Sequence, residues 1–254
     1  MNQTVDLNAD MGESFGPWRM GDDAGLLEVV TSANIACGFH AGDPDVMLQT
    51  MQNAVQRGVG LGAHPGFADL QGFGRHRLQV PQATLQNQIR YQIGAAQAMA
   101  RAAGGQLRHL KLHGALANMA AEDESLATAC YDAALSVAPE LAIMFLAATA
   151  QQQAAQALGC SYICEIFADR AYNDDGTLVD RSQPGAVIKD ADLAGARIAD
   201  MVRRGAIVTV SGKEIATRID TICLHGDTPA AVEIARKVRA ALQSAGIRVA
   251  QFPV

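Results

Sequence analysis

Short apolar runs alternate along this chain with longer helix-forming stretches, and this alternation constrains its fold more than any other feature. Residues 33–37 begin one such unit: the apolar run is followed by His40 between two glycines, and Asp43 and Pro44 then supply an N-cap and a first helical residue. The unit is a strand, a loop with a reactive side chain, and a helix. Its recurrence along the chain is typical of an α/β protein.

These units predict seven or eight parallel strands joined by right-handed helical crossovers. The predicted strands are residues 5–10, 33–37, 59–63, 107–112, 141–147, 161–168, 206–210 and 221–224, with a last apolar run at 247–252. The predicted helices are residues 22–31, 44–57, 81–103, 122–138, 151–158, 190–204 and 229–245. Polar groups follow nearly every strand, whereas an open sheet would gather them at one switch point. We therefore expect a closed, TIM-like (β/α) barrel, complete or one strand short, as a single domain over residues 1–254.

Length and composition agree with this fold and exclude some partners. A chain of 254 residues can bury a large single core. The hydrophobic fraction of 49% with only 5% aromatic residues suits helices packed closely on a sheet. The net charge of -6 is spread without blocks of like charge, which argues against nucleic acid or an anionic membrane as a partner.

Cysteine usage and the lack of targeting signals predict a cytoplasmic protein. The five cysteines are an odd number without a CxxC pair, and most lie in apolar runs, which is typical of free buried thiols in a reducing compartment. The first residues lack the basic and apolar regions of a signal peptide, and no apolar run reaches the length of a membrane span.

Four of the six histidines, His40, His64, His113 and His225, fall at the predicted carboxyl ends of four different strands. One such histidine alone is most often structural, but packing does not readily explain four. Since the carboxyl ends of parallel strands meet at one rim of a barrel, we expect a shared functional site there.

The first predicted strand adds polar groups to that rim. Asp6, Asn8 and Asp10 share one face because side chains alternate along a strand. Asp10 with His40 and His64 offers one carboxylate and two imidazoles, a set suited to Zn, Mn or Fe. The same residues can also act as acid/base and hydrogen-bonding groups without a metal, and their spacing matches no local metal signature. Both interpretations therefore stay open.

Charged residues near other strand ends could bind an anion. Lys111 lies between two leucines in a predicted strand, which argues against a surface role. Arg75 and Arg170 could each hold a carboxylate or phosphate with two hydrogen bonds, although a solvated loop is the plain alternative for Arg75. Asp169 beside Arg170, and Asp227 beside a rim histidine, are placed as acid/base partners, and Asp227 could also cap the following helix.

Nucleotide-binding motifs are incomplete in this sequence. Residues 211–213 resemble the end of a P-loop, but Ile207 stands where the first glycine belongs. The residues by themselves therefore identify no ATP site.

Several longer motifs occur together and in order. They are DLNADMGE at 6–13, NIACGFHAGD at 34–43, GAHP at 62–65, GFGR at 72–75, KLHG at 111–114, FADRAY at 167–172 and HGD at 225–227. With these motifs the whole chain resembles the LamB/YcsF family. The resemblance implies a (β/α)7 barrel similar to polysaccharide deacetylases. It also implies ATP-dependent hydrolysis of the lactam of 5-oxo-L-proline to L-glutamate, with partner subunits B and C and an ATP site that lies on, or is shared with, a partner subunit.

The motif positions are then the expected site residues, and chemistry suggests their roles. Asp10 or Asp169 is the expected general base, and His40, His64 and His113 are expected to bind and polarise the reacting oxygens. The expected substrate- or phosphate-binding residues are Asn8, Glu13, Asn34, Arg75, Lys111, Glu165, Arg170, His225 and Asp227.

Two other functions stay open at this point. One is a metal-dependent deacetylase or amidase that acts without ATP, and the other is a non-catalytic subunit that binds the lactam. A divalent metal and a homo-oligomer are compatible with either.

Overall fold

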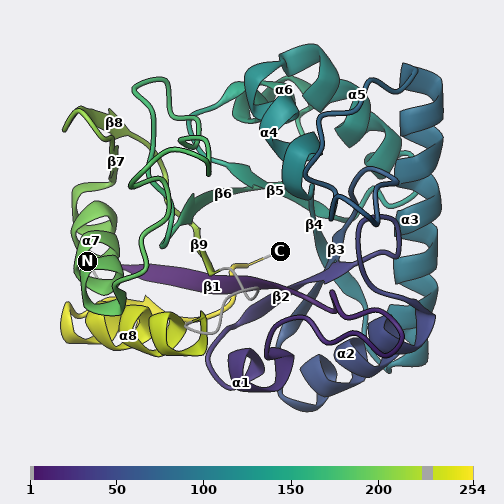
Figure 1. Cartoon of the computed structure of the whole chain (residues 1–254), viewed down its shortest axis with the longest axis horizontal. Coiled ribbons are helices and arrows are strands. Elements are labelled where there is room, and N and C mark those ends of the chain that lie inside the picture. The colour runs from purple at the N-terminus through teal and green to yellow at the C-terminus, as the bar shows by residue number, and fades with distance from the viewer. Residues whose placement is uncertain (1–2, 225–230, 254) are drawn as a thin grey trace.

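The computed structural model describes residues 3–224 and 231–253, and within them seven parallel strands close into a ring (Figure 1). The ring consists of β1 (Thr4–Met11), β2 (Ser32–Ala36), β3 (Gly60–His64), β4 (Leu107–Lys111), β5 (Ala142–Leu146), β6 (Tyr162–Phe167) and β9 (Thr221–Leu224). Neighbours in sequence pair in order, and β9 closes the ring by pairing with both β6 and β1. The predicted α/β barrel, one strand short of eight, is confirmed.

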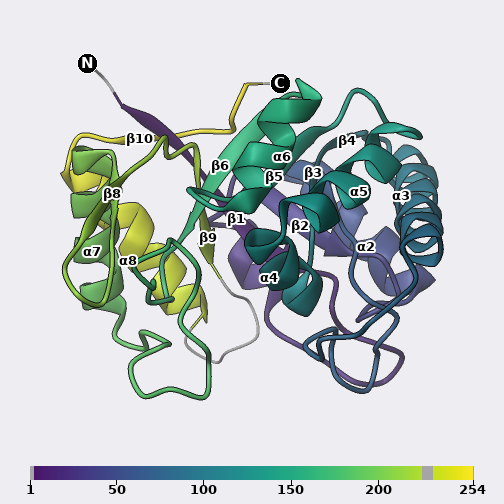
Figure 2. The same cartoon turned by 90° about the horizontal axis from the view of Figure 1, so that it is seen from above.

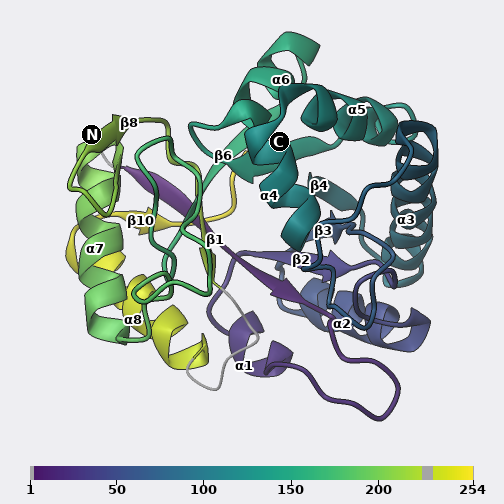
Figure 3. The ribbon, with the colours of Figure 1, turned by 45° about the horizontal axis from the view of Figure 1, so that its top comes forward.

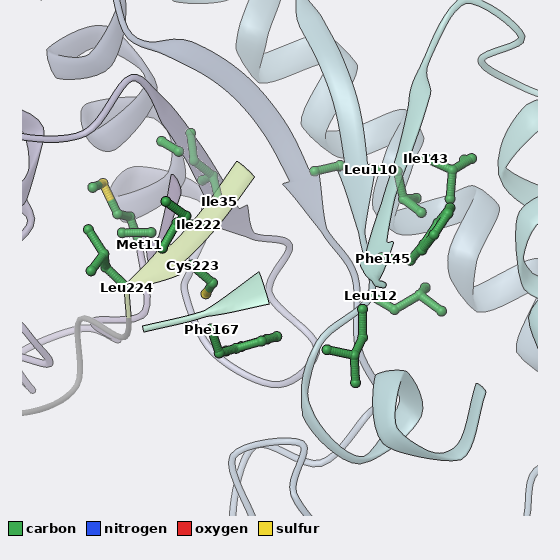
Figure 4. Close-up of a cluster of buried hydrophobic side chains, with 14 of the residues drawn as sticks. Met11, Ile35, Leu110, Leu112, Ile143, Phe145, Phe167, Ile222, Cys223 and Leu224 are labelled. Atoms are coloured by element: carbon green, nitrogen blue, oxygen red, sulfur yellow. The ribbon is translucent and has the colours of Figure 1, made fainter. Parts of the chain in front are cut away.

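Helices surround the ring on its outside (Figure 1). They are α1 (Asp23–Leu27), α2 (Pro44–Gln56), α3 (Gln82–Ala102), α4 (Gly114–Glu122), α5 (Glu124–Leu135), α6 (Ala150–Leu158), α7 (Ala191–Arg204) and α8 (Ala231–Ser244). The core lies between helices and strands, where apolar side chains such as Ile35, Leu110, Ile143 and Ile222 are buried (Figure 4). Among the described residues, no helix combines the length and apolar character needed to cross a membrane.

Several side chains that point into the ring are polar, since alternate residues of each strand face inward. Asp6 accepts hydrogen bonds from Ser32 and Thr221 on the two neighbouring strands. Asn34 donates to Asn8 and to Asp10, so the three polar residues predicted to share one face of the first strand do so. The predicted alternation of side chains along β1 therefore places Asp6, Asn8 and Asp10 inside the barrel.

Local capping explains why α2 begins where the sequence predicts. The Asp43 side chain accepts hydrogen bonds from the backbone N–H groups of Asp45 and Val46, and Pro44 occupies the first turn. Gly42 before this cap has a φ of +77°, and a Cβ there would lie 2.6 Å from the Gly12 carbonyl oxygen. A glycine is therefore required where the two loops of the rim meet.

Two predicted helices differ from the structure, and one helix was not predicted. The helix predicted over 22–31 ends at Leu27, because Thr31 already pairs with Leu7 of β1. The helix predicted over 122–138 is α5 alone, and the preceding α4 was not predicted. The cause is Asp123, whose side chain caps α5 and thereby separates it from α4. Figure 3 shows α4 lying near β4, where it packs against α5 and α6.

The prediction of a barrel strand at 206–210 is wrong. Residues 206–208 form β7 (Ala206–Val208), which pairs antiparallel with β8 (Glu214–Ala216) in a separate two-stranded sheet. A turn with Gly212 at a φ of +87° joins the two strands. The ring does not need this strand, since β6 pairs directly with β9. The incomplete P-loop at 211–213 is therefore a hairpin turn.

Different segments of the chain lie on the two sides of the barrel. The loops after β1, β3 and β6 extend on one side, whereas the start of β1 and β10 (Arg248–Val249) lie on the other (Figure 2). On that second side β10 extends the sheet beside β1.

The five cysteines are free thiols, and all except Cys160 are buried, as predicted.

Candidate functional site

A cavity of about 530 Å³ opens at the carboxyl ends of the strands. Several of the predicted site residues line it, and they come from different segments of the chain: Asp10, Glu13, Arg75, His64, Lys111, His113, Glu165 and Arg170. Phe167 at the end of β6 extends toward Leu112 at the end of β4 and forms an apolar part of the wall (Figure 4). These residues, which the sequence places at the rim, therefore line one cavity.

Three imidazole rings form a compact, buried cluster at one side of the cavity. His64 ends β3, and its Nε2 lies 3.0 Å from Nδ1 of His113, which follows β4. His40, from the loop after β2, stacks on His113 with ring centroids 3.6 Å apart and an interplanar angle of 4°. Burial, followed by the neighbouring imidazoles, lowers the pKa of His40 and of His113 well below the ordinary value. Both rings are therefore neutral at pH 7.

Backbone carbonyls fix two of these rings. His64 Nδ1 lies 2.8 Å from the carbonyl oxygen of Lys111, and His113 Nε2 lies 2.8 Å from that of Phe73. Phe73 has a φ of +54°, which is unusual for a residue other than glycine. The loop after β3 is thus held in a strained conformation that presents this carbonyl to the cluster.

Glu13 completes the cluster from the loop after β1. Its Oε1 lies 3.6 Å from His40 Nε2 and 3.9 Å from His113 Nδ1. One ligand atom from each of Glu13, His40, His64 and His113 lies within 4.8 Å of all the others, and all four residues are buried. These four residues could hold a metal ion. The sequence indicated Asp10 with His40 and His64, and in the structure Asp10 lies beside this group, with Oδ2 3.3 Å from His64 Nε2.

Lys111 forms the centre of a second buried group. Its Nζ lies 2.9 Å from Asp10 Oδ1, 2.9 Å from Glu165 Oε1 and 3.0 Å from Cys223 Sγ. Burial opposes the charged form, but the negative groups around Lys111, Asp10 first, outweigh it and hold its pKa well above the ordinary value. Lys111 is therefore charged and ties Asp10 to the opposite wall of the barrel.

Arginines line the outer part of the cavity. Arg75 packs over the Phe73 ring, with its guanidinium carbon 4.9 Å from the ring centroid. Arg77 pairs with Glu122 at 2.6 Å. Arg170 donates to the carbonyl oxygens of two residues of the loop after β6, and burial, then the charge of Arg181, lowers its pKa to about 10. This wall is cationic, whereas the floor carries carboxylates.

Some predicted site residues lie away from the cavity surface. Asn8 and Asn34 are buried below it inside the barrel, where Asn34 donates to both Asn8 and Asp10. His40 lies behind His113, and Asp169 is buried and is not among the described residues that line the cavity. His225 and Asp227 lie outside the described residues.

The sequence interpretation also missed His109, which is buried inside the barrel below the site. Its Nε2 lies 2.7 Å from Asn34 Oδ1, and burial lowers its pKa to about 3. The signal was present, because His109 precedes Lys111 by two positions in a strand and must share its face.

Sequence comparison places the chain among known proteins. A sequence model described as the LamB/YcsF family matches residues 5–254. This chain belongs to the LamB/YcsF family. It is 66% identical over 248 residues to a Ruegeria pomeroyi protein named as the A subunit of 5-oxoprolinase, with 98% of both chains covered.

Solved structures agree with this membership of the LamB/YcsF family. The crystal structure of a lactam utilization protein from Thermus thermophilus has a TM-score of 0.92 and 42% identity, covering 98% of this chain and 100% of that one. The catalytic domain of a peptidoglycan N-acetylglucosamine deacetylase from Eubacterium rectale has a TM-score of 0.50 at 12% identity, covering 100% of this chain and 90% of that one. At this identity the second likeness concerns the fold alone, and it confirms the predicted similarity to polysaccharide deacetylases.

Proposed function

We propose that this chain is part of an ATP-dependent 5-oxoprolinase, which hydrolyses the lactam of 5-oxo-L-proline to L-glutamate. The observation that carries the proposal is the cavity, whose floor holds Asp10 against His64 and whose outer wall is cationic. The names of the Thermus and Ruegeria relatives, a lactam utilization protein and a 5-oxoprolinase subunit, support the same substrate class.

The chemistry requires an activated amide, because a five-membered lactam is a poor electrophile. Transfer of the terminal phosphoryl group of ATP to the lactam oxygen releases ADP and creates a leaving group. Water then attacks the ring carbon, and the carbon–nitrogen bond breaks as the nitrogen takes up a proton, which leaves an acyl phosphate. A second water hydrolyses this acyl phosphate and releases phosphate. Overall, ATP, two waters and the lactam give ADP, phosphate and glutamate.

Asp10 is the group best placed to accept the proton of the attacking water. Its Oδ2 faces His64, while Asn34 and Lys111 both hold Oδ1. Two donors on one oxygen fix the carboxylate and leave the other oxygen directed at the site. In this scheme Lys111 positions Asp10 and compensates its charge, and His64 and His113 polarise the reacting oxygens. Asp169, the other candidate base, is less well placed, because it does not line the cavity.

The arginines of the outer wall bind the anionic part of the substrate. Arg75 and Arg170 line the same cavity as Asp10, and Arg181 adds a third guanidinium. A carboxylate on the lactam ring, or a transferred phosphate, would be held there while the amide points to the floor. The letter in the name of the Ruegeria relative, an A subunit, supports assembly with subunits B and C, one of which would carry or share the ATP site. We retain a cytoplasmic location as part of this proposal.

The test is to assay ADP and glutamate formation by this chain with and without candidate subunits B and C. Asp10→Asn and His64→Ala should each lower turnover by at least about 100-fold, the usual contribution of acid/base catalysis. Asp132→Asn and His76→Ala change the same residue types at exposed positions and should retain activity. Full activity of correctly folded Asp10→Asn and His64→Ala complexes would contradict this placement.

A metal-dependent amidase or deacetylase is the second candidate, and the Glu13/His40/His64/His113 cluster favours it. Turnover of an amide without ATP, lost on chelation and restored by a divalent metal, would identify this function instead. The assay above distinguishes the two when it is repeated without nucleotide.

A further inference from the structure

The hydrogen bonds around the imidazole cluster determine which ring nitrogens carry protons. A carbonyl oxygen only accepts, so His64 must donate through Nδ1 to Lys111, and His113 must donate through Nε2 to Phe73. The remaining nitrogens, His64 Nε2 and His113 Nδ1, face each other across 3.0 Å. Two lone pairs at this distance repel, so the contact is stable only when the two nitrogens share a proton or a metal ion.

His40 provides a third imidazole nitrogen that could bind a metal ion. It is fully buried, and neither of its ring nitrogens has a hydrogen-bond partner within the described part of the chain. Buried polar atoms of this kind are rare, because each costs desolvation without compensation. The ring is nevertheless held firmly, since it stacks on His113 and approaches the backbone at Gly66 and Gly74.

The spacing of the donors fits one metal ion. Ligand atoms bound tetrahedrally at ordinary zinc–nitrogen distances lie about 3.4 Å from one another. The separations here are 3.0 Å between His64 and His113, and 3.6 Å and 3.9 Å from Glu13 Oε1 to His40 and His113. The carbonyl oxygens of Lys111 and Phe73 accept hydrogen bonds from the outer ring nitrogens of His64 and His113. They thereby fix the orientation of both rings, and the inner ring nitrogens can bind a metal ion.

We propose that Glu13, His40, His64 and His113 bind one divalent transition-metal ion beside the cavity. Three imidazoles and one carboxylate favour zinc or a neighbouring first-row ion over magnesium or calcium, which prefer oxygen ligands. Glu13, His64 and His113 also line the cavity, so the ion lies within reach of a bound molecule. This proposal does not depend on the lactam reaction, because it concerns binding by the chain alone.

The test is metal binding by the isolated full chain. The purified protein is stripped with a chelator and titrated with Zn²⁺ by calorimetry and with Co²⁺ by visible absorption. We expect one ion per chain, a strong cobalt absorption typical of four-coordinate nitrogen-rich sites, and much weaker binding of Mg²⁺. His64→Gln and His113→Gln should each weaken Zn²⁺ binding by at least about 100-fold, which exceeds the loss typical of an outer partner.

The matched control is His76→Gln, which removes an exposed histidine that lies outside the cluster. It should bind Zn²⁺ with unchanged stoichiometry and affinity. Equal weakening in His76→Gln would overturn the assignment, as would unchanged binding in the two cluster variants. If those variants do not fold, the unsubstituted chain still decides: no bound ion, or a cobalt spectrum like that of the free ion, rejects the site.

Discussion

At the scale of single residues, the inside of the barrel is a continuous network of hydrogen-bonded side chains. Asn34 connects its parts, since its amide donates to Asn8 and Asp10 and its oxygen lies 2.7 Å from His109 Nε2. Buried polar groups are stable only when their partners are in place. The network thereby supports the floor of the cavity, and small changes within it should be costly.

Gly62 shows how tightly this network is packed. A Cβ at this position would lie 2.0 Å from His109 Nε2. We expect Gly62→Ala to lower the free energy of unfolding by about 1–3 kcal/mol, the usual cost of overpacking, as measured by urea denaturation. Gly94→Ala in α3, where a Cβ meets nothing within 4 Å, should instead stabilise the protein by about 0.5–1 kcal/mol. A neutral Gly62→Ala would mean that His109 can move aside.

Asp6 should make stability depend on pH. Burial raises the pKa of this carboxyl to about 6, against hydrogen bonds from Thr221, Thr31 and Ser32 that lower it. A raised pKa means that the folded state holds the proton more tightly, so this contribution is complete below the unfolded pKa of 3.8 and is lost as the pH rises through 6. Between pH 4 and pH 7 the loss should be roughly 2 kcal/mol.

The comparison that isolates Asp6 uses Asp6→Asn. Unfolding free energies of both proteins are measured across this pH range. The stability of the unsubstituted protein relative to Asp6→Asn should fall as the pH rises from 4 to 7. Parallel pH profiles for the two proteins would show that Asp6 titrates normally.

At the scale of elements, caps and turns decide where helices stop and which strands enter the ring. α4 and α5 are separated in sequence only by Asp123, which accepts hydrogen bonds from Ser125 and Leu126 as the N-cap of α5. The shorter helix, α4, begins directly after His113 and lines the cavity. The β7–β8 hairpin shows the same principle, because its tight turn keeps both strands out of the barrel.

Replacement of the α5 cap should have a measurable cost. Asp123→Ala removes the side-chain acceptor of two backbone N–H groups and should destabilise the protein by about 1 kcal/mol in urea unfolding. Asp132→Ala, at an exposed position within α5, should change stability by no more than about 0.5 kcal/mol. Equal effects of the two substitutions would argue that Asp123 does not cap the helix.

At the scale of the whole molecule, the barrel has a cavity side and a closed side. The cavity and its loops occupy the carboxyl ends of the strands, and the segment after α8 covers the opposite end. There Phe252 is buried against Ala142, Met144 and Ile163 inside the ring, and Arg108 donates to its carbonyl oxygen. The ring is therefore filled from both ends, with polar groups toward the cavity and apolar groups beneath β5 and β6.

Phe252 should contribute to the stability of the whole barrel. Phe252→Ala removes a buried aromatic ring that packs against strands of the ring, and the expected loss is about 3–5 kcal/mol in urea unfolding. Leu193→Ala, on the exposed face of α7, should cost no more than about 0.5 kcal/mol. A small effect at Phe252 would indicate that the closed side contributes little to folding.

The sequence by itself determined the alternation of strands and helices, the closed barrel and the rim where polar side chains meet. These properties follow from local patterns, namely apolar periodicity, caps such as Asp43 and the rule that parallel strands share their carboxyl ends. They also identified His40, His64 and His113 as residues of the rim.

Only the tertiary structure decided the contacts between segments far apart in the chain. It brought Glu13 to the three histidines beside Asp10, placed Asp169 away from the cavity surface, and put β7 outside the ring. The reason is physical: these outcomes depend on ångström-scale distances between loops and on which strands find partners, and no local pattern encodes either. The carbonyls of Phe73 and Lys111, which orient two imidazoles, have no side-chain signature at all.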